Sequence, residues 1–212
     1  VVVWDRFEIF GIRRSASGIA QGAPFQVNTT TNYPELSPEV ARSSDGEFVV
    51  TWVVNGLDGD SYGVFGQRFD AAGNGLGGEF QVNSQTAGSQ ASPDVSVAAD
   101  GSFVIVWNLG LAADNGVFGR RYSPSGNPQG EFRVDDHGDP GGRHPAVSHA
   151  PDGDFVVTWE AYGHENAGSS SYGIFARRFT SGGQPIGGSF SINQNTLGDQ
   201  EEPVLAHGPA GG

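Results

Sequence analysis

The feature that most constrains this chain is a unit of about fifty residues that occurs four times along it. In each copy a tryptophan closes a run of β-branched residues: VVVW, FVVTW, FVIVW and FVVTW. The tryptophans are 48, 55 and 52 residues apart, at Trp4, Trp52, Trp107 and Trp159. Such a period is typical of repeat folds, in which one copy alone cannot bury its apolar face and needs its neighbours.

Three further motifs follow in the same order in every copy. A GxFxxR-like segment lies at 8–14, 62–69, 115–122 and 172–179, and an FQVN-like tetrad at 25–28, 80–83, 132–135 and 190–193. Ten residues after each tetrad stands a proline: Pro38, Pro93, Pro145 and Pro203. The gap from each tryptophan to the phenylalanine of the GxFxxR-like segment, by contrast, varies from 6 to 16 residues. Fixed spacing marks scaffold, so we expect function in the variable loop.

Each unit predicts four strands. One begins at the proline, and an Asp-Gly turn at Asp45, Asp100 or Asp152 links it to the FVVTW strand as in a hairpin. The GVFGQRF strand and the EFQVN strand complete the unit, and the 34 glycines of the chain suit the many tight turns. Four antiparallel strands per repeat predict an all-β protein, a four-bladed β-propeller.

The two ends of the chain complement each other. After Pro203 the sequence keeps the repeat spacing and stops one residue before the expected phenylalanine, while VVVW opens at residue 1. We therefore expect a ring closed by pairing of the N- and C-terminal strands, which leaves no exposed sheet edge. The alternative is a piece of a longer array. The predicted single domain 1–212 has blades at 1–37 plus 203–212, 38–92, 93–144 and 145–202.

Charge and composition exclude several partners. The formal net charge of −13 repels nucleic acid and anionic lipid, and the chain has neither cysteine nor an apolar run long enough for membrane insertion. Position 1 is not methionine, which is compatible with a removed signal peptide. An acidic chain without cysteine is typical of secreted bacterial proteins, so we expect an extracellular or periplasmic location.

The pattern DGxFVVxW, YGxFxQRFDAxG and GxEFQVN resembles a repeat of very large secreted bacterial proteins, many of them adhesin-like and carrying calcium-binding glycine-rich modules. The resemblance covers nearly the whole chain and implies the fold more strongly than a function. The first copy departs most, because its loop is short and Arg14 stands where the other copies have Phe69, Tyr122 and Phe179.

One arginine recurs in the third strand of each copy: Arg13, Arg68, Arg121 and Arg178. These side chains would form an axial ring for an anionic ligand, or serve as structural arginines that find acceptors at the seams between blades. The tryptophans and GxF phenylalanines would likewise stack on sugars or pack between blades.

Candidate ligand-binding residues lie in the variable loops: Asn55, Asp58, Asp60, Tyr62, Asp114, Asn115, Glu165, Asn166 and Tyr172. Calcium binds six to eight oxygen ligands on flexible loops, which makes five aspartates candidate ligands. They are Asp58, Asp60, Asp135, Asp136 and Asp139. No EF-hand loop is present, and Asp-rich solvated turns are the alternative explanation.

No catalytic signature occurs in the sequence. GxSxG, HExxH and nucleotide-binding motifs are absent, and the five histidines have no metal-binding spacing. We therefore predict a non-enzymatic binding module, with adhesion or protein–protein interaction as its role and a glycan or protein partner. Two alternatives stay open: a structural subunit of a larger assembly or long adhesin, and a polysaccharide-acting hydrolase or lyase whose acids converge only in space.

Overall fold

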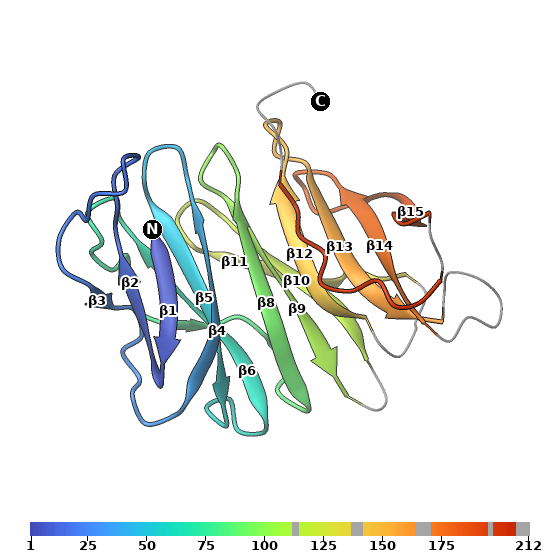
Figure 1. Cartoon of the computed structure of the whole chain (residues 1–212), viewed down its shortest axis with the longest axis horizontal. Helices are drawn as coiled ribbons and strands as arrows, with labels where there is room; N and C mark the ends of the chain where they lie inside the picture. Colours follow the sequence, from blue (N-terminus) through green and yellow to red (C-terminus); the bar gives the residue numbers. More distant parts are fainter. Residues whose placement is uncertain (112–114, 137–141, 164–170, 195–196, 207–212) are drawn as a thin grey trace.

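The computed structural model describes residues 1–111, 115–136, 142–163, 171–194 and 197–206, and within them it contains antiparallel sheets and no helix. No helix capable of spanning a membrane therefore occurs in this part of the chain. Sheet 1 has three strands, and sheets 2, 3 and 4 have four each (Figure 1). Sheet 1 consists of β1 (Val2–Arg6), β2 (Glu8–Ile12) and β3 (Phe25–Gln26); sheet 2 of β4 (Glu35–Arg42), β5 (Phe48–Asn55), β6 (Tyr62–Phe69) and β7 (Phe80–Gln81); sheet 3 of β8 (Ser89–Val97), β9 (Phe103–Gly110), β10 (Gly116–Tyr122) and β11 (Pro128–Arg133); sheet 4 of β12 (Arg143–His149), β13 (Phe155–Tyr162), β14 (Tyr172–Phe179) and β15 (Pro185–Ser191).

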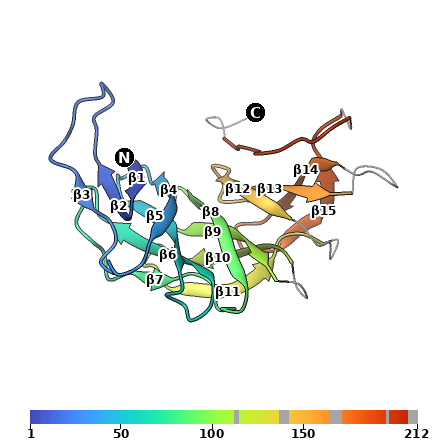
Figure 2. The same ribbon diagram turned by 60° about the horizontal axis from the view of Figure 1, so that its bottom comes forward.

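The sheets stand side by side in sequence order and form a curved row, like blades of a propeller (Figure 2). The strands β4, β8 and β12 face one another along the inside of the row, and β1 continues this line, since β1 contacts β4, β4 contacts β8 and β8 contacts β12. The predicted all-β class and the one antiparallel sheet per repeat are confirmed. The exception is sheet 1, which lacks a first strand among the described residues.

The described residues do not show the predicted ring closure. β1 pairs with β2 alone, and the tail, residues 200–206, belongs to no strand. The tail lies instead along sheet 4, where the Glu202 N–H donates to the Glu160 carboxylate at 2.6 Å and Glu201 pairs with Arg143 at 2.6 Å. These contacts place the tail at the opposite end of the row from β1 (Figure 2).

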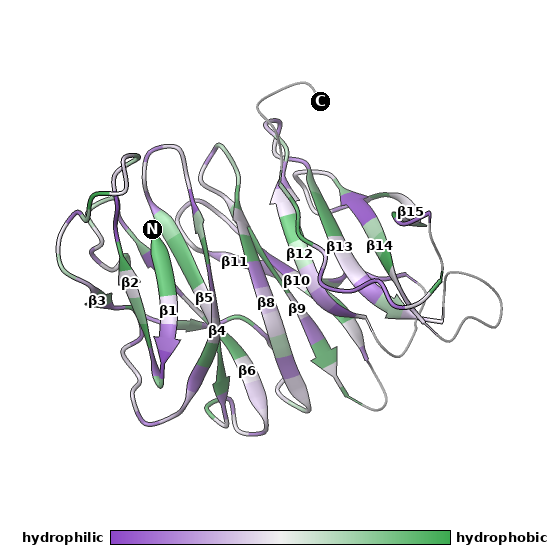
Figure 3. Ribbon diagram, viewed as in Figure 1, coloured by the Kyte–Doolittle hydropathy of each residue, from purple (hydrophilic) through white to green (hydrophobic). Residues whose placement is uncertain are grey.

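The core lies between neighbouring sheets. β5 is buried on both faces because sheet 1 covers one face and sheet 3 the other, and β9 is likewise covered by sheets 2 and 4. Many residues within the strands are accordingly apolar, drawn in green in Figure 3. Trp52, Trp107 and Trp159 are buried in this core, which leaves no surface of theirs for a sugar.

An aromatic cluster recurs at each seam, the contact between two successive sheets. Phe48 and Phe69 of sheet 2 stack at 4.9 Å between ring centroids, and Phe25 of sheet 1 packs on both at 6.2 and 5.6 Å. Phe80 packs in the same way on the Phe103–Tyr122 stack, and Phe132 on the Phe155–Phe179 stack. The departure at Arg14 has a physical reason, because no described sheet precedes sheet 1 and needs such a stack there.

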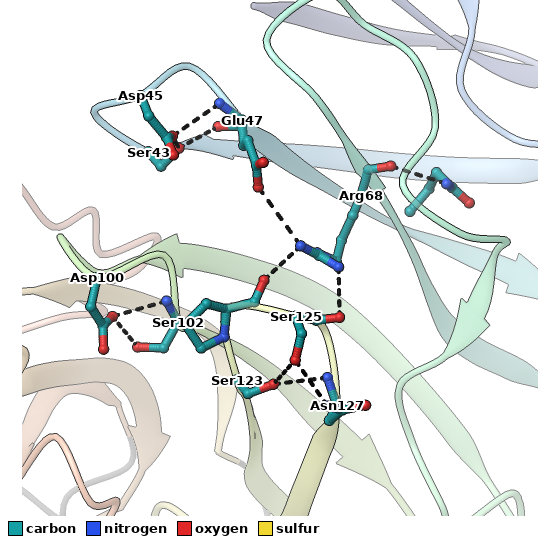
Figure 4. Close-up of polar contacts among 11 residues, drawn as sticks. Ser43, Asp45, Glu47, Arg68, Asp100, Ser102, Ser123, Ser125 and Asn127 are labelled. Atoms are coloured by element: carbon teal, nitrogen blue, oxygen red, sulfur yellow. Dashed lines mark hydrogen bonds and ion pairs between the residues drawn. The ribbon is translucent and has the colours of Figure 1, made fainter.

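The recurring arginines cross the same seams. The Arg68 guanidinium donates to the carbonyl oxygens of Pro124 at 2.6 Å and Ser125 at 2.8 Å, and lies 3.7 Å from the Glu47 carboxylate (Figure 4). Gly126 has a φ of 83°, and a Cβ there would lie 2.8 Å from the Arg68 guanidinium. The turn thus needs glycine both for its backbone and for space. Arg13 and Arg121 donate equivalently to Ala71 O at 2.8 Å and Gly182 O at 2.9 Å.

Candidate functional site

A bulge interrupts the three first strands β4, β8 and β12 around their prolines. The strand register shifts between Leu36 and Glu39, and correspondingly in β8 and β12. The residue before the proline adopts a left-handed backbone, which a side chain other than glycine rarely does. These residues and their φ angles are Ser37 (53°), Ser92 (49°), His144 (46°) and Glu202 (56°). Strain that recurs at one place in a fold points to a functional site.

All four of these strained residues line one cavity, here called the axial pocket. It has a volume of about 460 Å³ and lies where the first strands and the tail converge. Each repeat contributes residues around its proline. The lining residues are Ser37, Glu39, Ser92, Pro93, Asp94, His144, Pro145, Ala146, Glu202, Pro203, Val204 and Leu205.

Three acidic residues from three repeats line the axial pocket: Glu39 of β4, Asp94 of β8 and Glu202 of the tail. Asp94 accepts hydrogen bonds from the N–H groups of Val147 (2.7 Å) and Val95 (2.8 Å), which fix its carboxylate between β8 and β12. Burial nevertheless raises the pKa of Asp94 to about 6. Desolvation in the pocket, together with the negative charge of Asp94, raises the pKa of Glu39.

Glu160 of β13 is buried behind the pocket and holds its wall. Its carboxylate contacts Arg143 Nε at 2.6 Å and His144 Nδ1 at 2.9 Å, and it accepts from the Glu202 N–H at 2.6 Å. Burial acts to raise the pKa of Glu160, but these hydrogen bonds outweigh it and lower that pKa. Glu160 therefore fixes His144 and Glu202, both of them lining residues.

The loop residues that the sequence singled out lie at the same end of the sheets as the axial pocket, because β5 ends beside the start of β4. None of them lines the pocket. The Asp58 carboxylate accepts from Asn83 Nδ2 at 3.1 Å, and that of Asp60 accepts from the Gly88 N–H at 2.9 Å.

The other described loop candidates also contact the protein itself. Arg143 stacks over the Tyr172 ring at 3.7 Å. Asn55 and Tyr62 are a strand pair at the base of this loop, and the carbonyl oxygen of Asn115 accepts from Arg133. Asp114, Glu165 and Asn166 lie outside the described residues.

The candidate calcium ligands are occupied by protein partners where they are described. Asp135 pairs with Arg133 at 2.7 Å, and Asp136 pairs with Arg177 at 3.6 Å and accepts from the Ser189 N–H. Among the residues that the structure describes, no group of three or more acids and histidines is arranged to hold a metal ion. Asp139 lies outside the described residues, and no observation tests calcium binding.

The arginines assigned to an axial ring or to a structural role do not line the axial pocket. Arg13, Arg68 and Arg121 contact the seams described above. The residues that do line the pocket were missed by the sequence analysis. The sequence feature that could have indicated them is the residue before the proline of each repeat, which is serine in two copies, histidine in the third and glutamate in the fourth.

Comparison with known proteins places the fold. No family model matches the chain, and no curated protein matches it. Among solved structures, it is similar to an endo-arabinanase of glycoside hydrolase family 43 from Bacillus licheniformis, with 14% identity over 92% of this chain and 79% of that one, at a TM-score of 0.50. It is also similar to a thermostable family-43 glycoside hydrolase, with 13% identity, 92% and 76% coverage and a TM-score of 0.51. The shared feature is the fold.

These comparisons correct the functional prediction. Both of these solved structures are glycoside hydrolases, and neither is described as an adhesion or calcium-binding protein. The interpretation as a non-enzymatic, adhesin-like module was wrong because it relied on missing linear motifs. In glycoside hydrolases the two catalytic carboxyl groups are brought together by the fold, so they leave no signature of spacing along the chain.

Proposed function

We propose that the axial pocket binds a polysaccharide and hydrolyses a glycosidic bond. The observation that carries this proposal is the convergence of Glu39, Asp94 and Glu202 in one open cavity. They come from three repeats. Glycoside hydrolysis needs two carboxyl groups, one to protonate the leaving oxygen and one to act on the other face of the sugar. The likeness of the fold to two glycoside hydrolases supports the same reading.

Glu39 is the proposed proton donor. A proton donor benefits from a pKa above the ordinary value of a carboxyl group, and desolvation together with the charge of Asp94 raises the pKa of Glu39. Asp94 is the less suitable donor, because two backbone N–H groups already hydrogen-bond its oxygens. It would instead keep Glu39 protonated and stay fixed while the substrate enters.

Glu202 is the proposed second carboxylate. It lies in the tail beside β12, whereas Glu39 lies on β4, so β8 with Asp94 stands between them. The Glu202 backbone is held by Glu160, and the left-handed φ of 56° fixes the direction of its side chain. Glu202 would activate water or attack the sugar, while His144 at the same wall would contact sugar hydroxyl groups.

The proposed substrate is a neutral polysaccharide, for which arabinan is the first to test. A net charge of −13 disfavours polyanionic chains. A polymer of this kind would meet the enzyme outside the cytoplasm, in keeping with the predicted extracellular or periplasmic location. Incubation of the protein with arabinan and a panel of neutral polysaccharides, followed by chromatography of the released oligosaccharides, measures the activity.

Conservative variants test the roles. Glu39→Gln and Glu202→Gln should each lower kcat about 10²- to 10⁴-fold, because each removes one proton-transferring or attacking group. Asp152→Asn is the matched control, since that carboxylate lies in the Asp-Gly turn at the opposite end of β12 from the pocket. Equal activity of all three variants, or no product from any polysaccharide with the wild-type protein, would contradict the proposal. Circular dichroism checks that the variants are folded.

A further inference from the structure

Sheet 4 has an outer face that no described sheet covers. At every seam the valine of the FQVN-like tetrad is buried, as seen for Val27, Val82 and Val134. The equivalent Ile192 is 51% exposed. Phe190, which corresponds to the seam phenylalanines Phe25, Phe80 and Phe132, is 45% exposed. Both apolar elements of a seam are therefore present on sheet 4, and neither is packed against an aromatic stack.

Arg178 is the third seam element on this face. Its equivalents Arg13, Arg68 and Arg121 each donate to a carbonyl oxygen in the glycine turn of the following sheet. In the part of the chain that the structure describes, the exposed Arg178 side chain has no hydrogen-bond partner. The Arg178 guanidinium, the Phe190 ring and the Ile192 side chain therefore all lack the following sheet that their equivalents contact.

The tail already occupies the place of the first strand of a next sheet. The Gln200 N–H donates to Tyr172 O at 2.9 Å, as the Glu35 N–H at the start of β4 donates to Phe7 O at 3.1 Å. Asn193 Nδ2 donates to Gln200 Oε1 at 2.9 Å, as Asn83 Nδ2 donates to Gln90 at the start of β8. The left-handed residue and the proline follow in register. Yet the tail pairs with no strand, and Val204 is 91% exposed.

We propose that this open face, defined as Arg178, Phe190, Ile192 and residues 200–206, binds one further sheet of the same repeat. The three existing seams specify its chemistry: a stacked aromatic pair under Phe190, a glycine turn whose carbonyl oxygens accept from Arg178, and a strand that pairs with the tail. Sheet 1 does not meet this specification, because Arg14 stands where the second aromatic is required. The stacks of sheets 2, 3 and 4 are already occupied. The open face shares Glu202, Pro203, Val204 and Leu205 with the axial pocket, but the proposal rests on the seam contacts and not on the proposed hydrolysis.

The test supplies the missing sheet in repeat spacing. A copy of residues 48–83 is joined directly after Gly212, so that the phenylalanine of the copy stands ten residues after Pro203, as Phe48 does after Pro38. Hydrogen exchange of the amides of residues 204–206, which lie in the unpaired tail, is compared with that of the natural chain. We expect exchange at least tenfold slower in the extended chain.

Matched variants identify the contact. Alanine at the positions of the copied sheet that correspond to Phe48 and Phe69, the stacked pair, should abolish the slowing of exchange. Phe190→Ser in the extended chain should abolish it as well. An intact copy that leaves these amides unprotected overturns the proposal. The natural chain gives a second measurement. If its amides are already protected as a monomer, sheet 1 covers the face; if they become protected only with rising concentration in sedimentation experiments, a second copy does. Either result also overturns the proposal.

Discussion

A buried acid in sheet 2 offers a sharp test of the packing. Glu35 is fully buried at the start of β4, where sheet 3 has Gln90 and the tail has Gln200. Burial, together with the negative charges of Glu8 and Glu79, raises the pKa of Glu35 to about 8. At neutral pH the side chain is therefore a neutral carboxylic acid, a substitute for the glutamine amide at the two equivalent positions Gln90 and Gln200.

The sign of the pH dependence follows from proton binding. Glu35 has a higher pKa when folded than when unfolded, so its protonated form favours the folded state below the unfolded value. As the pH rises through the interval from the ordinary value of 4.5 to about 8, the unfolded chain ionises first and stability is lost. Each pH unit within this interval corresponds to about 1.4 kcal/mol, so the loss between pH 5 and pH 7 is at most about 3 kcal/mol.

The perturbation is Glu35→Gln, measured by urea unfolding from pH 5 to pH 8. The free energy of unfolding of the variant should exceed that of the wild type by an amount that grows with pH to about 3 kcal/mol. Gln90→Glu is the reciprocal control and should create the same pH dependence in sheet 3. A difference between wild type and Glu35→Gln that stays constant across this range would refute the reasoning, because other titrating groups cancel in it.

Two further predictions compare equivalent positions. Phe132→Ala should lower the free energy of unfolding by about 3–5 kcal/mol, because its ring packs on a buried aromatic stack. Phe190→Ala on the open face should lower it by less than about 1 kcal/mol. Equal losses for the two variants in chemical denaturation would refute the proposed difference between a seam and the open face. Gly126→Ala should cost more than the roughly 1–2 kcal/mol of left-handed strain, since the new Cβ meets Arg68, while Gly77→Ala, at a φ of 87° with nothing within 4 Å, should cost the strain alone. Thermal unfolding of the two glycine variants measures that difference.

The sequence predicted the sheets well because their determinants are local. The FVVTW run and the Asp-Gly turns fix strands and hairpins within one repeat, and the regular spacing requires each repeat to form the same sheet. Ring closure, by contrast, depends on a contact between the two ends, and spacing alone cannot decide it. The aromatic stack that would hold sheet 4 against sheet 1 is interrupted at Arg14. That single residue was noticed as a departure, but its meaning required the three observed seams.

The candidate site was beyond prediction for a different reason. Function was expected in the loops of variable length. The acids described there instead contact the protein's own backbone and amide groups, as Asp58 and Asp60 do. The pocket residues lie around the prolines, in a part of the repeat where the spacing of the motifs is the same in every copy. Their convergence depends on the curvature of the row of sheets, which brings Glu39, Asp94 and Glu202 together from positions far apart in the chain.

The position before each proline explains how a uniform repeat builds a site of mixed chemistry. This residue lines the axial pocket in all four copies, in three of them at a bulge of the first strand, and the proline after it restricts the backbone. The scaffold therefore does not depend on which side chain stands there. Ser37, Ser92, His144 and Glu202 give the pocket two hydroxyl groups, an imidazole and a carboxylate at equivalent places. The left-handed backbone recurs with each of these side chains, so the identity of this one residue can change without altering the scaffold.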